Sequence, residues 1–204
     1  MPLPSVLLEN AVAEFAKLPG IGKKTALRLV LHLLKKEVGE VQQFGEAIAK
    51  MRRDIKFCQR CFNVSDGDIC SICSNSMRNQ RMICVVENIR DVIAIESTQQ
   101  LSGTYHVLGG IISPLDGIGP DQLTIESLVN RIMKEETEEL VFALSPNILG
   151  DTTIYYIQKK IAHLPCRITT IARGIAFGGE LEYADEMTLS RSIANRLPIQ
   201  QYVK

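Results

Sequence analysis

Four cysteines form a compact block in the first half of the chain. Cys58 and Cys61 make one Cys-x-x-Cys knuckle, and Cys70 and Cys73 make a second after eight intervening residues. Two such knuckles at this separation can place four thiolates around one tetrahedral zinc ion. Because four protein ligands leave no open coordination position for a substrate, we expect one structural zinc ion per chain.

The same four cysteines would instead form two disulfides in an oxidising compartment. Residues 1–5 lack the basic and apolar regions of a signal peptide, and the chain has no apolar run of about 18 residues that would predict a membrane span. We therefore favour zinc and expect a cytoplasmic protein with no membrane association. The other two thiols, Cys84 and Cys166, lie in apolar runs and are predicted to be core residues.

Charge is divided unevenly along the 204 residues. Residues 1–81 hold 13 Lys and Arg against 8 Asp and Glu, a balance of +5, and residues 82–204 hold 10 against 15, a balance of −5. The zero net charge of the whole chain therefore conceals a basic front half and an acidic back half. The basic half is the part that an anionic partner would meet.

The basic half opens with two helical patterns that flank a glycine-containing break at residues 18–25. Its glycines permit a tight hairpin whose backbone N–H groups lie at the start of the second helix. Such a helix end binds anions through free N–H donors and the positive end of the helix dipole. Lysines in the first turn oppose that dipole unless an anion joins them. We expect a helix-hairpin-helix element that grips nucleic-acid phosphates without reading bases. Its expected contact residues are Gly20, Gly22, Lys23, Lys24 and Arg28.

A P-loop is the rival interpretation of this break, because the residues from Gly22 to Thr25 resemble its end. The P-loop pattern fails twice, since position 17 is Lys17 rather than glycine and Lys24 shifts Thr25 out of register. An ordinary helix connection without a ligand remains the second alternative. His32, farther along the second helix, has no partner at catalytic spacing and is expected to be structural.

Apolar residues at alternating steps of three and four predict an amphipathic helix before the cysteines. The stripe consists of Val41, Phe44, Ile48, Met51 and Ile55. It is expected to face either the core of the domain or an interface. The basic residues Arg52, Arg53 and Lys56 are expected at its carboxyl end, where they favour the helix dipole.

After the cysteines, short apolar runs alternate with helical patterns. Parallel strands covered on both faces read as continuous apolar runs, so this half is predicted to form a parallel sheet between helices. No G-x-G-x-x-G follows a strand, which argues against a dinucleotide site. The expected strands are residues 82–86, 105–108, 140–144 and 166–171, and the expected helices are residues 89–95, 125–133 and 152–162.

Taken together, these motifs resemble the bacterial RecR family of recombination mediators. The resemblance is carried by the Pro-Gly-Ile-Gly hairpin, the cysteine block and the Val-Val-Glu run ending at Glu87. It is carried further by Tyr-His-Val-Leu-Gly-Gly-Ile-Ile-Ser-Pro-Leu-Asp-Gly-Ile-Gly-Pro at residues 105–120 and by the tail at residues 178–189. These runs cover essentially the whole chain, in order.

The resemblance implies an α+β chain of four parts. They are a helix-hairpin-helix DNA-binding region at residues 1–56, a four-cysteine zinc finger at 57–76, an α/β Toprim domain with a parallel sheet at 80–175 and a C-terminal helical oligomerisation segment at 176–204. It also implies a nucleoid-associated DNA-repair protein that binds single- and double-stranded DNA without sequence specificity. With RecO and RecF, such a protein helps to load RecA on DNA coated by single-strand binding protein, and it forms a tetrameric ring.

Catalytic Toprim domains hold Mg²⁺ with a glutamate after the first strand and an Asp-x-Asp pair after a later one. Glu87 occupies the first position, but Ser145 and Asn147 follow the later strand instead of an aspartate pair. Leu149 also replaces a glutamate that the RecR family usually carries. We therefore expect no enzymatic activity, and we expect Glu87 and Asp91 to be partner-binding or solvated surface acids.

Two other functions remain open. A Mg²⁺-dependent Toprim enzyme for nucleotidyl transfer or DNA cleavage would need an unusual metal site. A zinc-stabilised scaffold that binds only proteins would leave the hairpin lysines without a role.

Apolar residues near both ends of the chain offer surfaces for a homo-oligomer, most simply a tetramer with two kinds of interface. A ring would place several hairpins on one DNA, so that the later contacts become intramolecular. These residues are Leu7, Leu8, Val12, Leu189, Ile193, Leu197, Ile199, Tyr202 and Val203.

Overall fold

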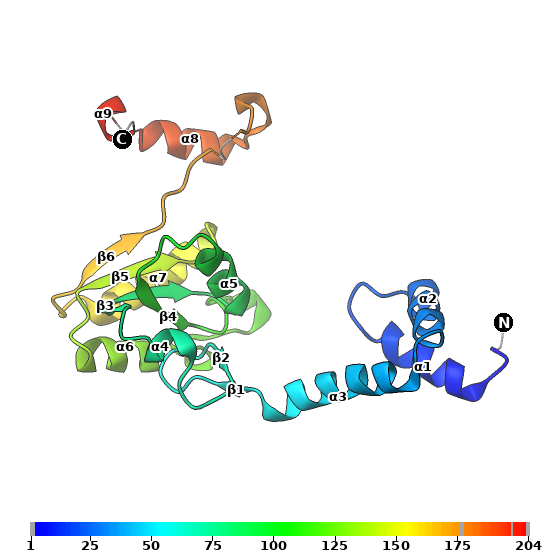
Figure 1. The fold of residues 1–204 in the computed structure, drawn as a ribbon. Helices are drawn as coiled ribbons and strands as arrows, with labels where there is room; N and C mark the ends of the chain where they lie inside the picture. Colours follow the sequence, from blue (N-terminus) through cyan, green and yellow to red (C-terminus); the bar gives the residue numbers. More distant parts are fainter. Residues whose placement is uncertain (1–2, 176–177, 197, 203–204) are drawn as a thin grey trace. The chain divides into compact units, whose positions relative to one another are not determined.

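The computed structural model describes residues 3–175, 178–196 and 198–202 (Figure 1). The chain divides into two compact units, Met1–Ile55 and Lys56–Lys204. None of the described helices is long and apolar enough to cross a membrane.

The first unit contains the three helices α1 (Val6–Ala16), α2 (Lys23–Leu33) and α3 (Val38–Asp54). α1 and α2 pack against each other around Val12, Ala26 and Val30. The predicted pair of helices is therefore confirmed.

The third helix carries its apolar stripe on an open face. α3 buries none of its side chains, and those of Phe44, Ile48 and Met51 are 45%, 50% and 53% exposed. In the part of the chain that the structure describes, this stripe therefore does not face a core of its own unit.

The second unit is built on a four-stranded parallel sheet, as the apolar runs predicted. Its order across the sheet is β4 (Gly103–Val107), β3 (Asn79–Val86), β5 (Glu139–Ala143) and β6 (Arg167–Thr170). All neighbouring strands run parallel, and Val85 of the central strand β3 lies opposite His106 on one side and Phe142 on the other.

Side chains of the sheet alternate between its two faces. Ile83 and Val85 join a larger core with α6 (Ile125–Lys134) and α7 (Ile148–Ile161). Cys84 and Val86 join a smaller core with α5 (Ile89–Ser97) on the other face (Figure 1). Both faces are covered, which is why the strands read as continuous apolar runs.

The cysteine block folds into a small ribbon and one short helix at the start of the second unit. These elements are β1 (Lys56–Phe57), β2 (Val64–Ser65) and α4 (Ser71–Ser74), with β1 antiparallel to β2. Lys56 lies in β1 and pairs with Asp68 at 2.9 Å, so the prediction that it ends the preceding helix was wrong. The extended backbone of Ile55 terminates α3 before that lysine.

The remaining elements are short and follow the strands. They are η1 (Pro114–Asp116), η2 (Pro120–Gln122), η3 (Leu181–Tyr183), α8 (Glu186–Ala194) and α9 (Ile199–Tyr202). The Asp185 carboxylate begins α8 by accepting a hydrogen bond from the Thr188 amide at 2.9 Å.

The apolar residues predicted for oligomer contacts divide into three groups. Leu8 and Val12 pack in the core between α1 and α2 and are not available for an interface. Leu7, Ile193 and Ile199 are exposed, whereas Leu189 is half-buried. Leu197 and Val203, and the side chain of Tyr202, lie outside the described part of the chain.

Candidate zinc centre and nucleic-acid interface

The four cysteines of the block come together in the folded chain. Their sulfur atoms all lie within 4.8 Å of one another, and all four side chains are buried. The backbone amides of Cys70 and Cys73 donate hydrogen bonds to the sulfurs of Cys58 and Cys70, at 3.3 and 3.4 Å, which stabilises negative charge on them. Four converging sulfurs fit one tetrahedral zinc ion, which requires Zn–S distances of about 2.3 Å.

Neighbouring side chains stabilise negative charge on the sulfur of Cys73. A hydrogen bond from the Cys61 thiol lowers the pKa of Cys73 to about 6, and the guanidinium charges of Arg131 and Arg60 act in the same direction. The hydrogen bond with Cys73, together with burial, raises the pKa of Cys61, and burial raises the pKa of Cys70. Zinc binds the thiolate and not the thiol, so the surroundings of Cys73 favour the form of this residue that binds the metal.

Arg60 fastens the first knuckle to the rest of the second unit. Its guanidinium donates two hydrogen bonds to the Glu135 carboxylate, at 2.6 and 2.8 Å. It donates a third, at 3.2 Å, to the carbonyl oxygen of Cys73 in the second knuckle. Because Arg60 lies between two zinc ligands in sequence, this residue couples the position of the knuckle to the end of α6.

Arg131 of α6 completes this network from inside the protein. Its side chain is 5% exposed and donates to the carbonyl of Tyr105, at 2.6 Å, and to the hydroxyl of Thr104, at 2.8 Å. It also donates to Glu135 at 2.9 Å. Burial alone would raise the pKa of Glu135, but the hydrogen bonds and charges of Arg60 and Arg131 outweigh it and hold that pKa below its ordinary value.

Phe62 and His106 make a second contact between knuckle and sheet. Their rings meet edge to face, with centroids 5.3 Å apart. Phe62 has a φ of 62°, a backbone conformation that bulky residues rarely adopt. The contact therefore forms although the backbone of Phe62 is in an unfavourable conformation. The Val107 amide also donates to the Cys61 carbonyl at 2.8 Å, so the knuckle bonds the edge strand β4. Burial, assisted by the charge of Arg131, lowers the pKa of His106 to about 3, and its ring is neutral.

The glycine break forms a tight hairpin between α1 and α2. Gly20 has a φ of +77°, and a side chain at Gly20 or Gly22 would meet no atom within 4 Å, so the backbone is open to a ligand. No side chain caps the first amides of α2, which leaves donors at the positive end of the helix dipole. Lys23, Lys24 and Arg28 are exposed within its first two turns. The structure thus places the five predicted contact residues on one short segment.

His32, which the sequence predicts to be structural, is exposed. It follows Arg28 by one helical turn and Lys24 by two, on the same face of α2. Steps of four residues in the sequence already place these three side chains on one face, whereas the leucines around His32 suggested an apolar helix.

Glu87 and Asp91 lie half-buried just beyond the carboxyl end of β3. The Ser145 hydroxyl donates to Glu87 at 2.6 Å. Asp91 accepts a hydrogen bond from the Asn88 amide at 2.8 Å and completes the capping box of α5. Asn147, at the other position where a catalytic Toprim domain has an aspartate, caps α7 through an amide hydrogen bond of 2.8 Å. Each of these side chains therefore has a bonding partner within the chain.

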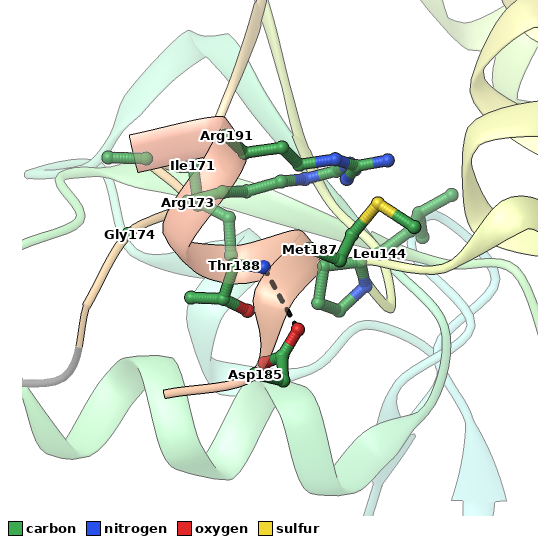
Figure 2. Close-up of a pocket in the computed structure, with 10 residues that line it drawn as sticks. Leu144, Ile171, Arg173, Gly174, Asp185, Met187, Thr188 and Arg191 are labelled. Atoms are coloured by element: carbon green, nitrogen blue, oxygen red, sulfur yellow. Dashed lines mark hydrogen bonds between the residues drawn. The ribbon is translucent and has the colours of Figure 1, made fainter. Parts of the chain in front are cut away.

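A cavity of about 460 Å³ lies where the C-terminal segment meets the ends of β5 and β6. Arg173 and Arg191 run side by side along it (Figure 2). Both pair with Asp151 of α7, at 2.7 and 3.4 Å. The hydrogen bond from Arg173 lowers the pKa of Asp151, and the charge of Arg191 adds to this effect. One carboxylate therefore ties α8 and the preceding linker to α7.

Four protein-family models match consecutive parts of the chain, and they confirm the predicted fold class. Their descriptions are RecR helix-hairpin-helix (residues 8–52), RecR four-cysteine zinc finger domain (residues 55–75), Toprim domain (residues 81–172) and RecR C-terminal (residues 174–197). The zinc-finger match coincides with the cluster of four sulfurs, so the cofactor prediction of one zinc ion is confirmed on both grounds.

Proteins named recombination protein RecR are similar to the chain over nearly all of its length. The one from Cytophaga hutchinsonii is 56% identical, and the match covers 96% of this chain and 96% of the relative. The one from Flavobacterium johnsoniae is 55% identical over 100% of this chain and 99% of the relative. By sequence, fold and zinc centre, the chain belongs to the RecR family of recombination proteins.

Proposed function

We propose that this chain is a non-enzymatic recombination mediator in DNA repair. It binds single- and double-stranded DNA without sequence specificity in the cytoplasm, at the nucleoid. With RecO and RecF, it helps to load RecA on DNA coated by single-strand binding protein. Membership of the RecR family supports the role in recombination. The DNA-binding part rests above all on the open hairpin, which is followed by the three exposed cations Lys23, Lys24 and Arg28.

Changing Lys23 and Lys24 together to alanine is expected to weaken binding to all DNA sequences alike. The contacts are to phosphates, and each phosphate contact releases counterions when the protein binds. A variant that has lost a contact therefore releases fewer counterions on binding. The slope of log K against log salt should therefore flatten by about 0.7 per contact on single strands and about 0.9 on duplex. Fluorescence anisotropy with two oligonucleotides of unrelated sequence, titrated at several salt concentrations, measures both effects.

Lys17→Ala is the matched control for this experiment. Lys17 is an exposed lysine of the same unit, but it pairs with Glu14 at 2.6 Å and precedes the hairpin. Its loss should leave the salt slope nearly unchanged. The DNA-binding proposal fails if the double variant binds as tightly as the parent, or if the parent strongly prefers one sequence.

The acidic side chains of the Toprim domain support a role without catalysis. Mg²⁺ requires clustered oxygen ligands, whereas Glu87 is bonded to a serine hydroxyl and Asn147 caps a helix. Within the described residues, three or more potential metal ligands converge only at the four cysteines. Mg²⁺-dependent DNA cleavage or nucleotidyl transfer that Glu87→Gln abolishes would overturn this part and favour the enzyme alternative.

Glu87 and Asp91 are the proposed docking residues for RecO or RecF. Each carboxylate uses one oxygen for its internal hydrogen bond, Oε2 of Glu87 and Oδ2 of Asp91. The other oxygen of each forms no hydrogen bond with any residue that the structure describes, which leaves an acceptor for a basic partner.

The proposal includes a homotetrameric ring with two kinds of interface. The first is the α3 stripe, an amphipathic face that a single chain leaves exposed and that a second copy would cover. The second is the C-terminal segment, where Ile193 and Ile199 are 59% and 72% exposed. Two interfaces of this kind, each used twice, close a ring of four chains.

Opening either interface is expected to halve the mass of the assembly. Ile48→Glu places a charge in the middle of the α3 stripe, and deletion of residues 198–204 removes the end of the C-terminal segment. Multi-angle light scattering should report a dimer for each change and a monomer for the combination, with zinc retained. Gln43→Glu, on the polar side of α3, adds the same charge away from the stripe and should leave a tetramer. A combined variant with the mass of the parent would exclude both interfaces.

A further inference from the structure

A groove on the outer face of α2 extends beyond the hairpin. Lys24, Arg28, Leu31 and Lys35 follow one another at steps of four, three and four residues, so they share one side of the helix. With Leu27 and His32 they line a cavity of about 450 Å³, which we call the α2 groove. Lys23 does not line it, although it precedes Lys24 directly.

The rim of the α2 groove carries uncompensated positive charge. Lys24, Arg28 and Lys35 form no ion pair with any residue of the described chain, whereas the neighbouring Lys36 pairs with Glu40 at 3.5 Å. No carboxylate side chain lines the groove. An occupant of this surface is therefore anionic.

The floor of the α2 groove is apolar and carries one flat ring. Leu31 is 40% exposed, although it belongs to a helix whose other face forms the core with α1. The exposed imidazole of His32 lies beside it. A phosphate alone would use the cationic rim and leave this floor in water. An occupant that fills the groove thus has a flat, apolar part next to its negative charges.

Nucleic-acid chemistry meets both requirements only in the single-stranded form. Unstacked bases lie on aromatic side chains, histidine included, while the neighbouring phosphates contact lysine and arginine. In a duplex, the base faces are stacked inside the helix and cannot reach such a floor. The groove also begins at Lys24, in the first turn of α2, so a strand bound at the hairpin can continue along it.

We propose that the α2 groove binds one unstacked base of single-stranded DNA. The base lies against His32 and Leu31, and its flanking phosphates contact Lys24, Arg28 and Lys35. This rests on the proposed DNA-binding function and adds a residue, His32, that distinguishes single strands from duplex. Lys23, outside the groove, serves phosphates of both forms at the hairpin.

His32→Ala tests this assignment with three probes of equal length: an oligothymidine, the same strand with abasic sites, and a duplex. Base stacking on an aromatic side chain changes affinity by at least about fivefold. The variant should therefore bind oligothymidine at least about fivefold more weakly, with the abasic strand and the duplex unaffected. His32→Phe keeps a flat ring and should bind oligothymidine like the parent. His32→Lys adds charge without a ring and should behave like the alanine variant.

Lys23→Ala is the matched control, and it should weaken binding of all three probes. If the parent binds none of them, the proposed DNA-binding function fails as well. If the parent binds DNA but His32→Ala binds all three probes equally well, only the α2 groove assignment falls. If His32→Lys binds oligothymidine as tightly as the parent, residue 32 contacts a phosphate and not a base, and the base assignment is overturned. Hexa-aspartate binding that His32→Ala abolishes, with DNA binding unchanged, would assign the groove to a protein partner instead.

Discussion

Changing Cys70 to serine is expected to release the zinc ion and to unfold the knuckle. A serine hydroxyl does not replace a thiolate, and the Cys70 sulfur also accepts the amide hydrogen bond of Cys73. In zinc-finger peptides the free energy of binding, about 10–16 kcal/mol at pH 7, is also free energy of folding. Elemental analysis should find less than one zinc per chain, and thermal unfolding should begin at a lower temperature than in the parent.

The damage should reach the sheet, because the knuckle is bonded to it. The Cys61 carbonyl accepts a hydrogen bond from Val107 of the edge strand β4, and Arg60 is bonded to Glu135 at the end of α6. Hydrogen exchange of the Val107 amide should therefore rise in Cys70→Ser. The hairpin belongs to the other compact unit, so DNA affinity should fall only in proportion to misfolding.

Cys166→Ser is the matched control for the zinc experiment. Cys166 is a half-buried thiol at the edge of the larger core, away from the four-sulfur cluster. Its replacement should leave the zinc content at one per chain. A Cys70→Ser protein that still holds one zinc would contradict the assignment. So would a parent that contains no zinc and has six alkylatable thiols.

Features that arise from local sequence could be predicted. The two Cys-x-x-Cys knuckles converge because the turns that bring them together lie within 16 residues, Cys58 to Cys73. The sheet followed from strands such as Asn79–Val86, whose second half, residues 83–86, enters cores on both faces and must therefore be apolar throughout. The hairpin followed from Gly20, where a positive φ is free of steric cost only for glycine.

Features that join distant parts of the chain could not be predicted. Arg60 and Glu135 are 75 residues apart in sequence, and neither has a neighbour that indicates the other. The sequence also did not show which side chains of a helix are buried, where its pattern allowed more than one face to point to the core. The stripe on α3 had the period of a core helix, and only the structure excludes a core within its unit. His32 stands among leucines, yet the helix turns it to solvent beside Arg28.

Glu135→Ala is expected to destabilise the second unit by about 3–5 kcal/mol, because it leaves a buried guanidinium without its charge partner. The side chain of Arg131 is 5% exposed, and that of Glu135 is 22% exposed. Arginine cannot relieve the loss by giving up its proton, since it stays charged in proteins. Arg60 loses both of its hydrogen bonds to the same carboxylate, so the knuckle is loosened from α6 as well.

Urea unfolding of the zinc-loaded protein measures the loss of stability in Glu135→Ala, and Glu138→Ala is the matched control. Glu138 also pairs with an arginine, Arg81, at 2.6 Å, but both side chains are exposed, at 61% and 53%. Water screens that pair, and its loss should change stability far less. Glu135→Gln keeps an acceptor without the charge and should fall between the two. All three variants should hold one zinc per chain, since no ligand is altered. If Glu135→Ala is no less stable than Glu138→Ala, then Arg131 is held by Tyr105 and Thr104 alone, and the carboxylate does not couple the zinc finger to the Toprim sheet.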